Sequence, residues 1–228
     1  MLEAVDLTRE GKKLSPPTAE HPTYYLPVYL GYKERGGVEQ SYQRKPPSEV
    51  EIRRQLAAML AKQHYLLAPK GGSPTIVLVI EWGSIVPTKV GDGRGGIITN
   101  ASEIRAYVAG DSARDLDRHG AYYTEISSLE PRHFLLISAF QYLAARDQKK
   151  EILLWRAHVT TGLWGNYLDE VIPTMIAHAG PILGKPMQPG AAWIPSKGRV
   201  IIGTPEVVDD NATLMKADEK KGSGGERK

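Results

Sequence analysis

A stretch between two apolar segments, 83–132, holds most of the side chains whose types suit chemistry. A glycine-rich loop, GDGRGG, lies near its start, a charged run, DSARDLDRHG, follows, and a pair of tyrosines comes next. Aromatic rings stack on a partner, and charged groups make strong hydrogen bonds to polar groups. We interpret the stretch as a recognition segment, with these candidate binding residues: Trp82 at its start, Arg94, Asp115, His119, Tyr122 and Tyr123.

Two other interpretations of this segment stay open. The first is a hydrolase, whose acid–base groups would come from segment 111–125: Asp111, Asp115, Asp117, His119 and Glu125. Such a site would be identified by a carboxylate–histidine pair with a perturbed pKa in a concave pocket. The second is an inert insertion that packs over a sheet edge.

The sequence contains a cofactor-like glycine motif, but the predicted strand and helix do not flank it as a cofactor site requires. Gly91, Gly93 and Gly96 spell GxGxxG, but a dinucleotide loop must follow a strand directly and open a helix. The preceding strand is predicted to end near Trp82 and the next helix cap lies near Asn100, so the loop fits at neither end. No Walker-type phosphate loop and no GxSxG nucleophile elbow are present. We therefore expect no cofactor.

Metal-binding patterns fail as well. Asp115, Asp117 and His119 weakly resemble a calcium loop, but Ile126 stands where a bidentate carboxylate is required. No two histidines have the i, i+4 spacing of a zinc-protease helix, and the chain has no cysteine. We expect no metal site, no disulfide and no thiol catalysis.

Apolar periodicity predicts the elements that must position the segment. Short β-branched and aromatic runs indicate strands, and apolar residues recurring every three to four positions indicate helices. In chain order we expect strand 23–32, helix 48–64, strand 75–82, insertion 83–132, strands 134–143 and 151–161, and helix 166–179. The fold class is α+β: a mixed sheet of four to five strands with two amphipathic helices on one face.

The residue types also predict how these strands are placed. Pro27 lacks a donor, so strand 23–32 should lie at a sheet edge, whereas the apolar run 75–82 should be central. Because a helix connects these two strands, they should be parallel. In strand 151–161 three polar residues alternate on one face, which we expect to be wet in its second half: Arg156, His158 and Thr160.

A single core should unite the two helices and the sheet. Its expected members are apolar residues of the predicted helices and strands: Ile52, Leu56, Leu60, Val77, Val79, Leu136, Trp155, Val171, Ile172 and Met175. Segment 1–22 should be an extended arm whose first fifteen or so residues are disordered, since they bury little apolar surface. We expect one domain over 23–208, with the insertion inside it, and a disordered tail over 209–228.

The charge of the chain gives little support for a nucleic-acid partner, which only the isoelectric point favours. The formal net charge is +3 and the isoelectric point is about 8.9, without the clustered Lys and Arg of a nucleic-acid binder. No apolar run reaches the length of a membrane span, and the first 20 residues lack the apolar core of a signal peptide. The oligomeric state is left open.

Several structural phrases resemble a group of bacterial cell-envelope proteins, often lipoproteins, that carry a domain of unknown function. The phrases are LAKQHY at 60–65, the strand 75–82, LLWRAHVTT at 153–161, the helix 171–183, and HPTYYLPVYLGY at 21–32. The resemblance implies an envelope or periplasmic domain with no assigned catalytic residue. If the chain begins at its natural N-terminus, the lack of a signal peptide indicates the cytoplasm instead.

We therefore expect a non-catalytic binding or scaffolding module of the bacterial envelope. Its partner would be another envelope protein or a glycan, and not a nucleic acid. The tyrosines, 11 against 2 phenylalanines, suit half-buried and interface positions. The alternative is the hydrolase that uses the groups within 111–125.

Overall fold

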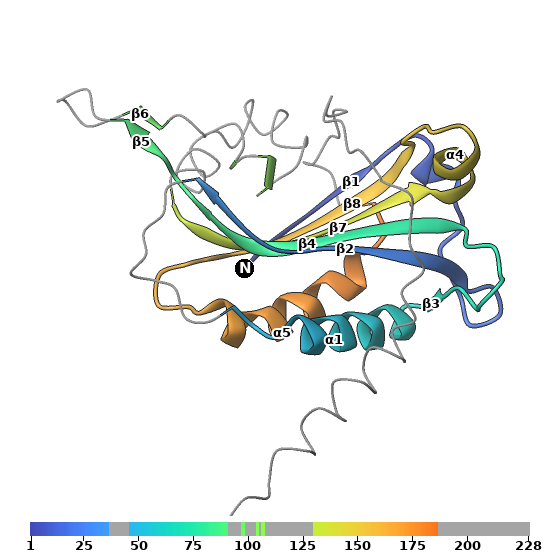
Figure 1. The fold of residues 1–228 in the computed structure, drawn as a ribbon, viewed down its shortest axis with the longest axis horizontal. Helices are drawn as coiled ribbons and strands as arrows, with labels where there is room; N and C mark the ends of the chain where they lie inside the picture. Colours follow the sequence, from blue (N-terminus) through green and yellow to red (C-terminus); the bar gives the residue numbers. More distant parts are fainter. Residues whose placement is uncertain (37–45, 91–96, 99–103, 105, 108–129, 187–228) are drawn as a thin grey trace, which may run out of the picture. The chain divides into compact units, whose positions relative to one another are not determined.

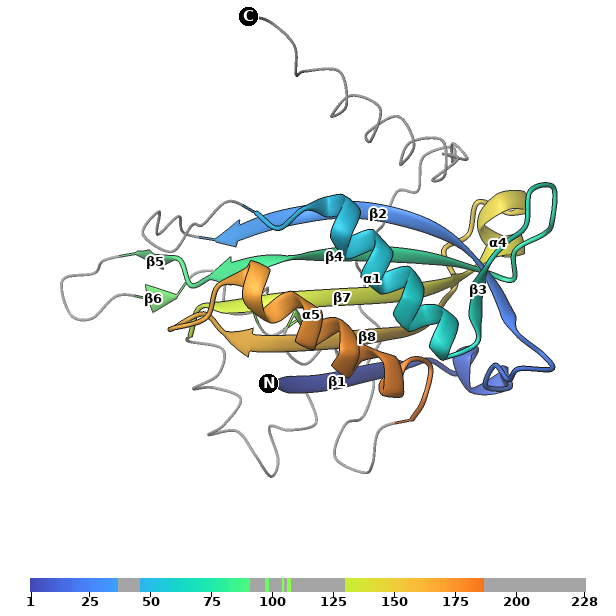
Figure 2. The same ribbon diagram turned by 90° about the horizontal axis from the view of Figure 1, so that it is seen from below.

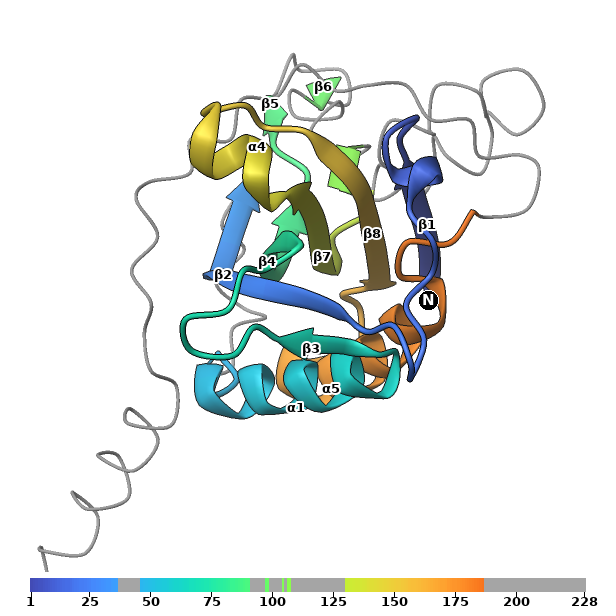
Figure 3. The ribbon, with the colours of Figure 1, turned by 90° about the vertical axis from the view of Figure 1, so that its right-hand side faces the viewer.

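A six-stranded mixed sheet forms the centre of the computed structural model, which describes residues 1–36, 46–90, 97, 98, 104, 106, 107 and 130–186. The strands are β1 (Leu2–Leu7), β2 (Thr23–Gly36), β3 (Tyr65–Leu67), β4 (Ile76–Val86), β7 (Arg132–Gln141) and β8 (Leu153–Gly162). Their spatial order is β1-β8-β7-β4-β2-β3. The pairs β2–β4 and β2–β3 are parallel and the others are antiparallel. Figure 3 shows that the sheet curls.

Two helices cover one face of this sheet, α1 (Glu49–Lys62) and α5 (Leu168–Ala179) (Figures 1 and 2). The predicted α+β class and the placement of both helices on one face are confirmed, but the main sheet has six strands and not the expected four to five. The smaller elements are the helix α4 (Tyr142–Asp147), the 3-10 turns η1 (Gly11–Lys13) and η5 (Gly180–Ile182), and the two-stranded sheet of β5 (Lys89–Val90) and β6 (Ile97–Ile98). None of the helices in the described residues is long and apolar enough to span a membrane.

The β2–α1–β4 connection has the predicted geometry. β2 and β4 are adjacent and parallel, and β4 lies between β2 and β7 with nearly all its residues buried. β3 pairs with only the first three residues of β2, so beyond Tyr25 no described strand pairs with its outer side. Pro27, which cannot donate to a ladder, lies in this part of the strand.

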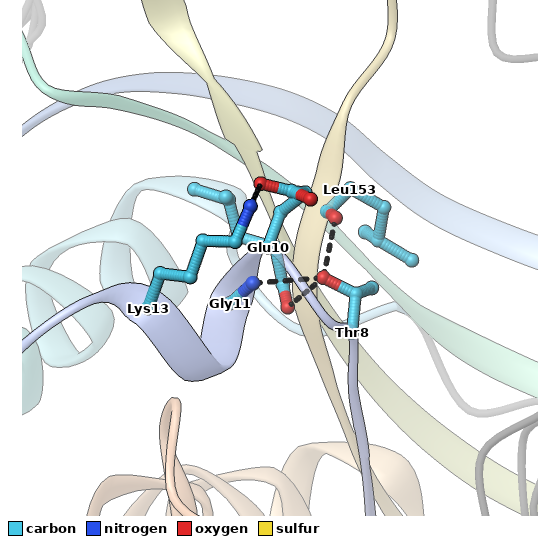
Figure 4. Close-up of polar contacts among 6 residues, drawn as sticks. Thr8, Glu10, Gly11, Lys13 and Leu153 are labelled. Carbon is cyan, nitrogen blue, oxygen red and sulfur yellow. Dashed lines mark hydrogen bonds and ion pairs between the residues drawn. The ribbon is translucent and has the colours of Figure 1, made fainter.

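The N-terminal segment differs from the prediction. Leu2–Leu7 form β1, which pairs with β8 along its length, so the expected disorder of the first residues is wrong over this strand. The strand is followed by a turn in which the Thr8 hydroxyl lies 2.9 Å from the carbonyl oxygens of both Leu153 and Leu154, and accepts the Gly11 N–H (Figure 4). A Cβ at Gly11 would lie 2.0 Å from the Leu154 oxygen, so this close approach requires glycine.

The core is divided between the two faces of the sheet, and the prediction of one core was therefore incomplete. The main cluster lies between the sheet and both helices, and it includes Leu56, Trp155, Ile172 and Met175. Leu136 points to the opposite face and packs in a second cluster with Ile85, Ile104 and Phe134. Val77 and Val79 are buried but belong to neither cluster. Successive residues of a strand face opposite sides, so β4 and β7 contribute to both.

Candidate functional site

Tyr107 connects the insertion to the sheet face opposite α1 and α5. Its hydroxyl donates to Glu81 Oε1 at 3.3 Å, and its backbone oxygen lies 3.1 Å from His158 Nδ1. Its ring packs against Phe134, with the ring centroids 4.5 Å apart, and the Arg35 guanidinium lies 5.5 Å from the ring centroid. One residue of the insertion is thus held by side chains from four strands of the sheet.

His158 is a fully buried polar group of this face. Its Nε2 lies 3.0 Å from Asp6 Oδ2, and the two side chains are 0% and 1% exposed. The Tyr107 carbonyl can only accept, so the His158 Nδ1–H donates to it, and Nε2 faces the Asp6 carboxylate. The expectation that the second half of β8 is wet on this face is therefore wrong, because His158 and Thr160 are fully buried.

The same face of the sheet carries further polar side chains on β2, β4, β7 and β8. Glu81 is 8% exposed and its Oε2 lies 3.6 Å from Arg35 Nη2. Arg156 donates from Nε to the Ser138 hydroxyl at 2.9 Å. The register places His158, on β8, opposite Leu136, and Leu136 opposite Glu81 on β4. His158 and Glu81 therefore flank Leu136, which belongs to the apolar cluster in which Tyr107 packs.

A second polar group lies on the helix-covered side, where β4 ends and β7 begins. Ser84 Oγ lies 2.9 Å from His133 Nδ1, and His133 Nε2 lies 3.1 Å from the Asn166 carbonyl oxygen. Because that carbonyl only accepts, Nε2 carries the proton and the Ser84 hydroxyl donates to Nδ1. Burial lowers the pKa of His133, while the Asn166 bond and the Asp169 charge act against the shift.

The Ser84–His133 pair resembles a serine hydrolase site but lacks, in the described part of the chain, the carboxylate that orients the histidine. Within the described residues no carboxylate hydrogen-bonds to His133, and the third group is the Asn166 backbone carbonyl. Nearby on β2, burial and the bonded Glu34 carboxylate raise the pKa of the Tyr32 hydroxyl, which holds it neutral. The arrangement fixes the imidazole as a neutral hydrogen-bonding group at the end of the sheet.

Most of the predicted binding residues lie outside the described part of the chain. These are Arg94, Asp115, His119, Tyr122 and Tyr123, together with the hydrolase candidates Asp111, Asp117 and Glu125. Trp82 is described: it is 1% exposed and packs in the main core, on the opposite face of the sheet from Tyr107. The described residues contain no cluster of three or more His, Cys, Asp or Glu with metal-site geometry.

Sequence reasoning missed the residues that the structure brings together. Asp6 lies in the segment expected to be a disordered arm, and no local sequence pattern marks Tyr107. A signal for Glu81 was present, because it is a lone charge inside the apolar run TIVLVIEW. The alternation of Arg156, His158 and Thr160 correctly grouped three side chains on one face, although their burial was not foreseen.

The chain matches no family profile, and comparison with curated proteins gives no significant match. Among solved structures, two crystal forms of the PelC dodecamer from Paraburkholderia phytofirmans, one of them a point variant, share 14% and 13% identity, with TM-scores of 0.33 and 0.32. The alignments cover 78% of this chain and 95% and 94% of those chains. A PDZ domain protein from Parabacteroides distasonis shares 10% identity at a TM-score of 0.38, over 78% of this chain and 34% of that one. Similarities of this size say nothing about activity or partners.

Proposed function

We propose that this protein is a non-catalytic binding module of the bacterial cell envelope, and that the insertion is its recognition element. The observation that carries the proposal is the anchoring of Tyr107 by Glu81, His158, Phe134 and Arg35. Binding residues favour loops that a rigid scaffold holds in place. The insertion has such a scaffold in the sheet face beneath Tyr107.

The free-energy cost of burying the polar residues that hold Tyr107 supports a specific role for this contact. Buried charges are expensive to desolvate, and apolar residues of the same size stabilise a fold equally well or better. The face nevertheless buries Asp6, His158 and Glu81, of which His158 and Glu81 hydrogen-bond to Tyr107. Directional hydrogen bonds fix one position of the Tyr107 backbone and ring, whereas apolar packing alone would tolerate several. Fixing one position of the insertion is useful where its flanking residues must meet a partner in a defined geometry.

The partner class follows from residue types and from the family resemblance. Arg94, Asp115 and His119 supply charge-assisted hydrogen bonds, and Tyr122 and Tyr123 supply stacking rings. These chemistries fit a polar envelope protein or a glycan. The envelope location rests on the resemblance of the strand and helix phrases, and the binding residues rest on their sequence types.

The test compares the full chain with a variant in which 87–129 is replaced by a short linker. This cut keeps β4, which ends at Val86, and β7, which begins at Arg132. Binding is measured against purified envelope glycan by co-sedimentation and against envelope proteins by quantitative crosslinking. We expect the linker variant to fold and to lose the specific partner.

A point variant tests the role of Tyr107 apart from the rest of the insertion. Tyr107→Ala should weaken partner binding at least tenfold, because the insertion loses its fixed position. Tyr142→Ala is the matched control, since Tyr142 also lies 5.5 Å beneath an arginine, Arg146, but on α4. A folded linker variant that binds the same partners as the full chain would refute the proposal.

A further inference from the structure

Arg132 is a buried cation without a close anionic partner in the described part of the chain. Its side chain is 7% exposed, and the nearest carboxylate oxygen, Glu130 Oε2, lies 3.9 Å from Nη1 on a side chain that is half exposed. Its Nε is buried and makes no hydrogen bond within the described residues. Burial lowers the pKa of Arg132, against the effect of Glu130. A buried guanidinium in this state is costly, so a bound anion would stabilise it.

A second unused donor lies on the same face. Thr160 is 0% exposed, and its buried hydroxyl has no hydrogen-bond partner within the described residues. The register pairs Arg132 with Gly162 and Phe134 with Thr160, so Arg132 and Thr160 are diagonal neighbours on β7 and β8. Such neighbours lie about 7–8 Å apart in antiparallel sheets, within reach of a long side chain such as that of arginine, so one small ligand could contact both donors.

We propose that Arg132 and Thr160 form a binding site for a carboxylate group. Arginine presents Nε and one Nη as a planar fork that matches the two oxygens of a carboxylate. The Thr160 hydroxyl supplies a third donor. The apolar neighbours Ile85 and Phe134 suit a group that carries its charge at one end. A single buried cation balances a monoanion, whereas a phosphate dianion would leave a net negative charge in the site.

The proposed carboxylate site is separate from the recognition residues of the insertion and can be tested independently. Tyr107→Ala tests that role, whereas Arg132 and Thr160 lie on strands that the linker variant keeps. The direct probe is the Arg132 Nε–H resonance in the 15N-labelled full chain, assigned from its absence in Arg132→Met. Sodium acetate, N-acetylglycine and sodium phosphate are titrated at pH 7 against sodium chloride of equal ionic strength. N-acetylglycine represents a carboxylate on a peptide unit, and acetate represents a free one.

We expect acetate or N-acetylglycine to shift this resonance in a saturable way and to raise the melting temperature of the protein. Arg132→Met should abolish the rise in melting temperature, and Thr160→Val should raise the dissociation constant about tenfold or more, as loss of a hydrogen bond to a charged group does. In chloride alone, Arg132→Met should match or exceed the wild-type melting temperature, because it removes an unpaired buried charge. Arg146→Met, at an exposed arginine paired with Asp147, is the control.

Three results would overturn the proposal. The first is the absence of any saturable shift with either carboxylate. The second is an equal shift with phosphate or with chloride, which would show general screening. The third is an Arg132→Met variant that keeps the carboxylate-dependent rise in melting temperature.

Discussion

Asp6 on β1 and His158 on β8 join two strands far apart in the sequence, with Oδ2 and Nε2 3.0 Å apart and both side chains buried. β1 carries a second pair on its other face, where Glu3 bonds to His178 of α5 on more exposed side chains. β1 is therefore fixed on both faces by a carboxylate and an imidazole. The two pairs differ mainly in burial, so they form a natural comparison.

Asp6→Asn should lower the free energy of unfolding by about 3–5 kcal/mol, because it breaks a buried pair and leaves His158 without its charged partner. Glu3→Gln should cost about 1 kcal/mol or less, since exposed pairs contribute little. Urea unfolding of both variants measures the difference. Equal costs for the two substitutions would show that burial does not set the strength of these pairs.

His133 should make stability depend on pH. Its folded-state pKa lies below the unfolded value of about 6.5, so the unfolded state binds more protons as the pH falls. The contribution is therefore fully present above about pH 6.5 and is lost as the pH falls toward the folded pKa. His133→Gln should reduce the loss of stability between pH 7.5 and 5, and Ser84→Ala, which keeps the imidazole, should retain most of it. Unchanged pH profiles in the histidine variant would contradict this.

Gly83 should not tolerate a side chain. A Cβ there would lie 1.8 Å from the Lys33 carbonyl oxygen on β2, so Gly83→Ala must push two paired strands apart. We expect a loss of about 3 kcal/mol or more, at the upper end of overpacking effects. Gly162→Ala, where no neighbouring atom lies within 4 Å, should change stability by about 0.5 kcal/mol or less. Thermal or urea unfolding of the two variants gives the comparison.

Truncating Trp155 should lower the free energy of unfolding far more than truncating Trp164. It is 3% exposed and meets the Tyr65 ring edge-on, with centroids 5.9 Å apart. Trp155→Ala should cost about 3–5 kcal/mol. Trp164 is 56% exposed, so Trp164→Ala should cost about 1 kcal/mol or less. A similar loss from both would mean that burial in the main core does not determine the effect.

Local patterns were sufficient for the regular elements. The stripe of Ile52, Leu56, Met59 and Leu60 predicted α1, and all four side chains are buried. Local patterns likewise predicted α5 and the antiparallel pair of β7 and β8, because helical and strand periodicities are properties of neighbouring residues. Ser48 precedes α1 but makes no side-chain capping hydrogen bond, and Glu51 in the first turn accepts from Arg54 and Gln55.

The sequence by itself determined the α+β class, the two amphipathic helices and the central strand β4, because short-range apolar periodicity encodes each of them. Only the tertiary structure decided that LEAVDL is a strand, since Asp6 meets a partner 152 positions later in the chain. It also decided that Tyr107 lies among Glu81, His158 and Phe134, and that Arg132 is buried. These placements depend on strand order and register, which arise from long-range pairing that no local pattern records.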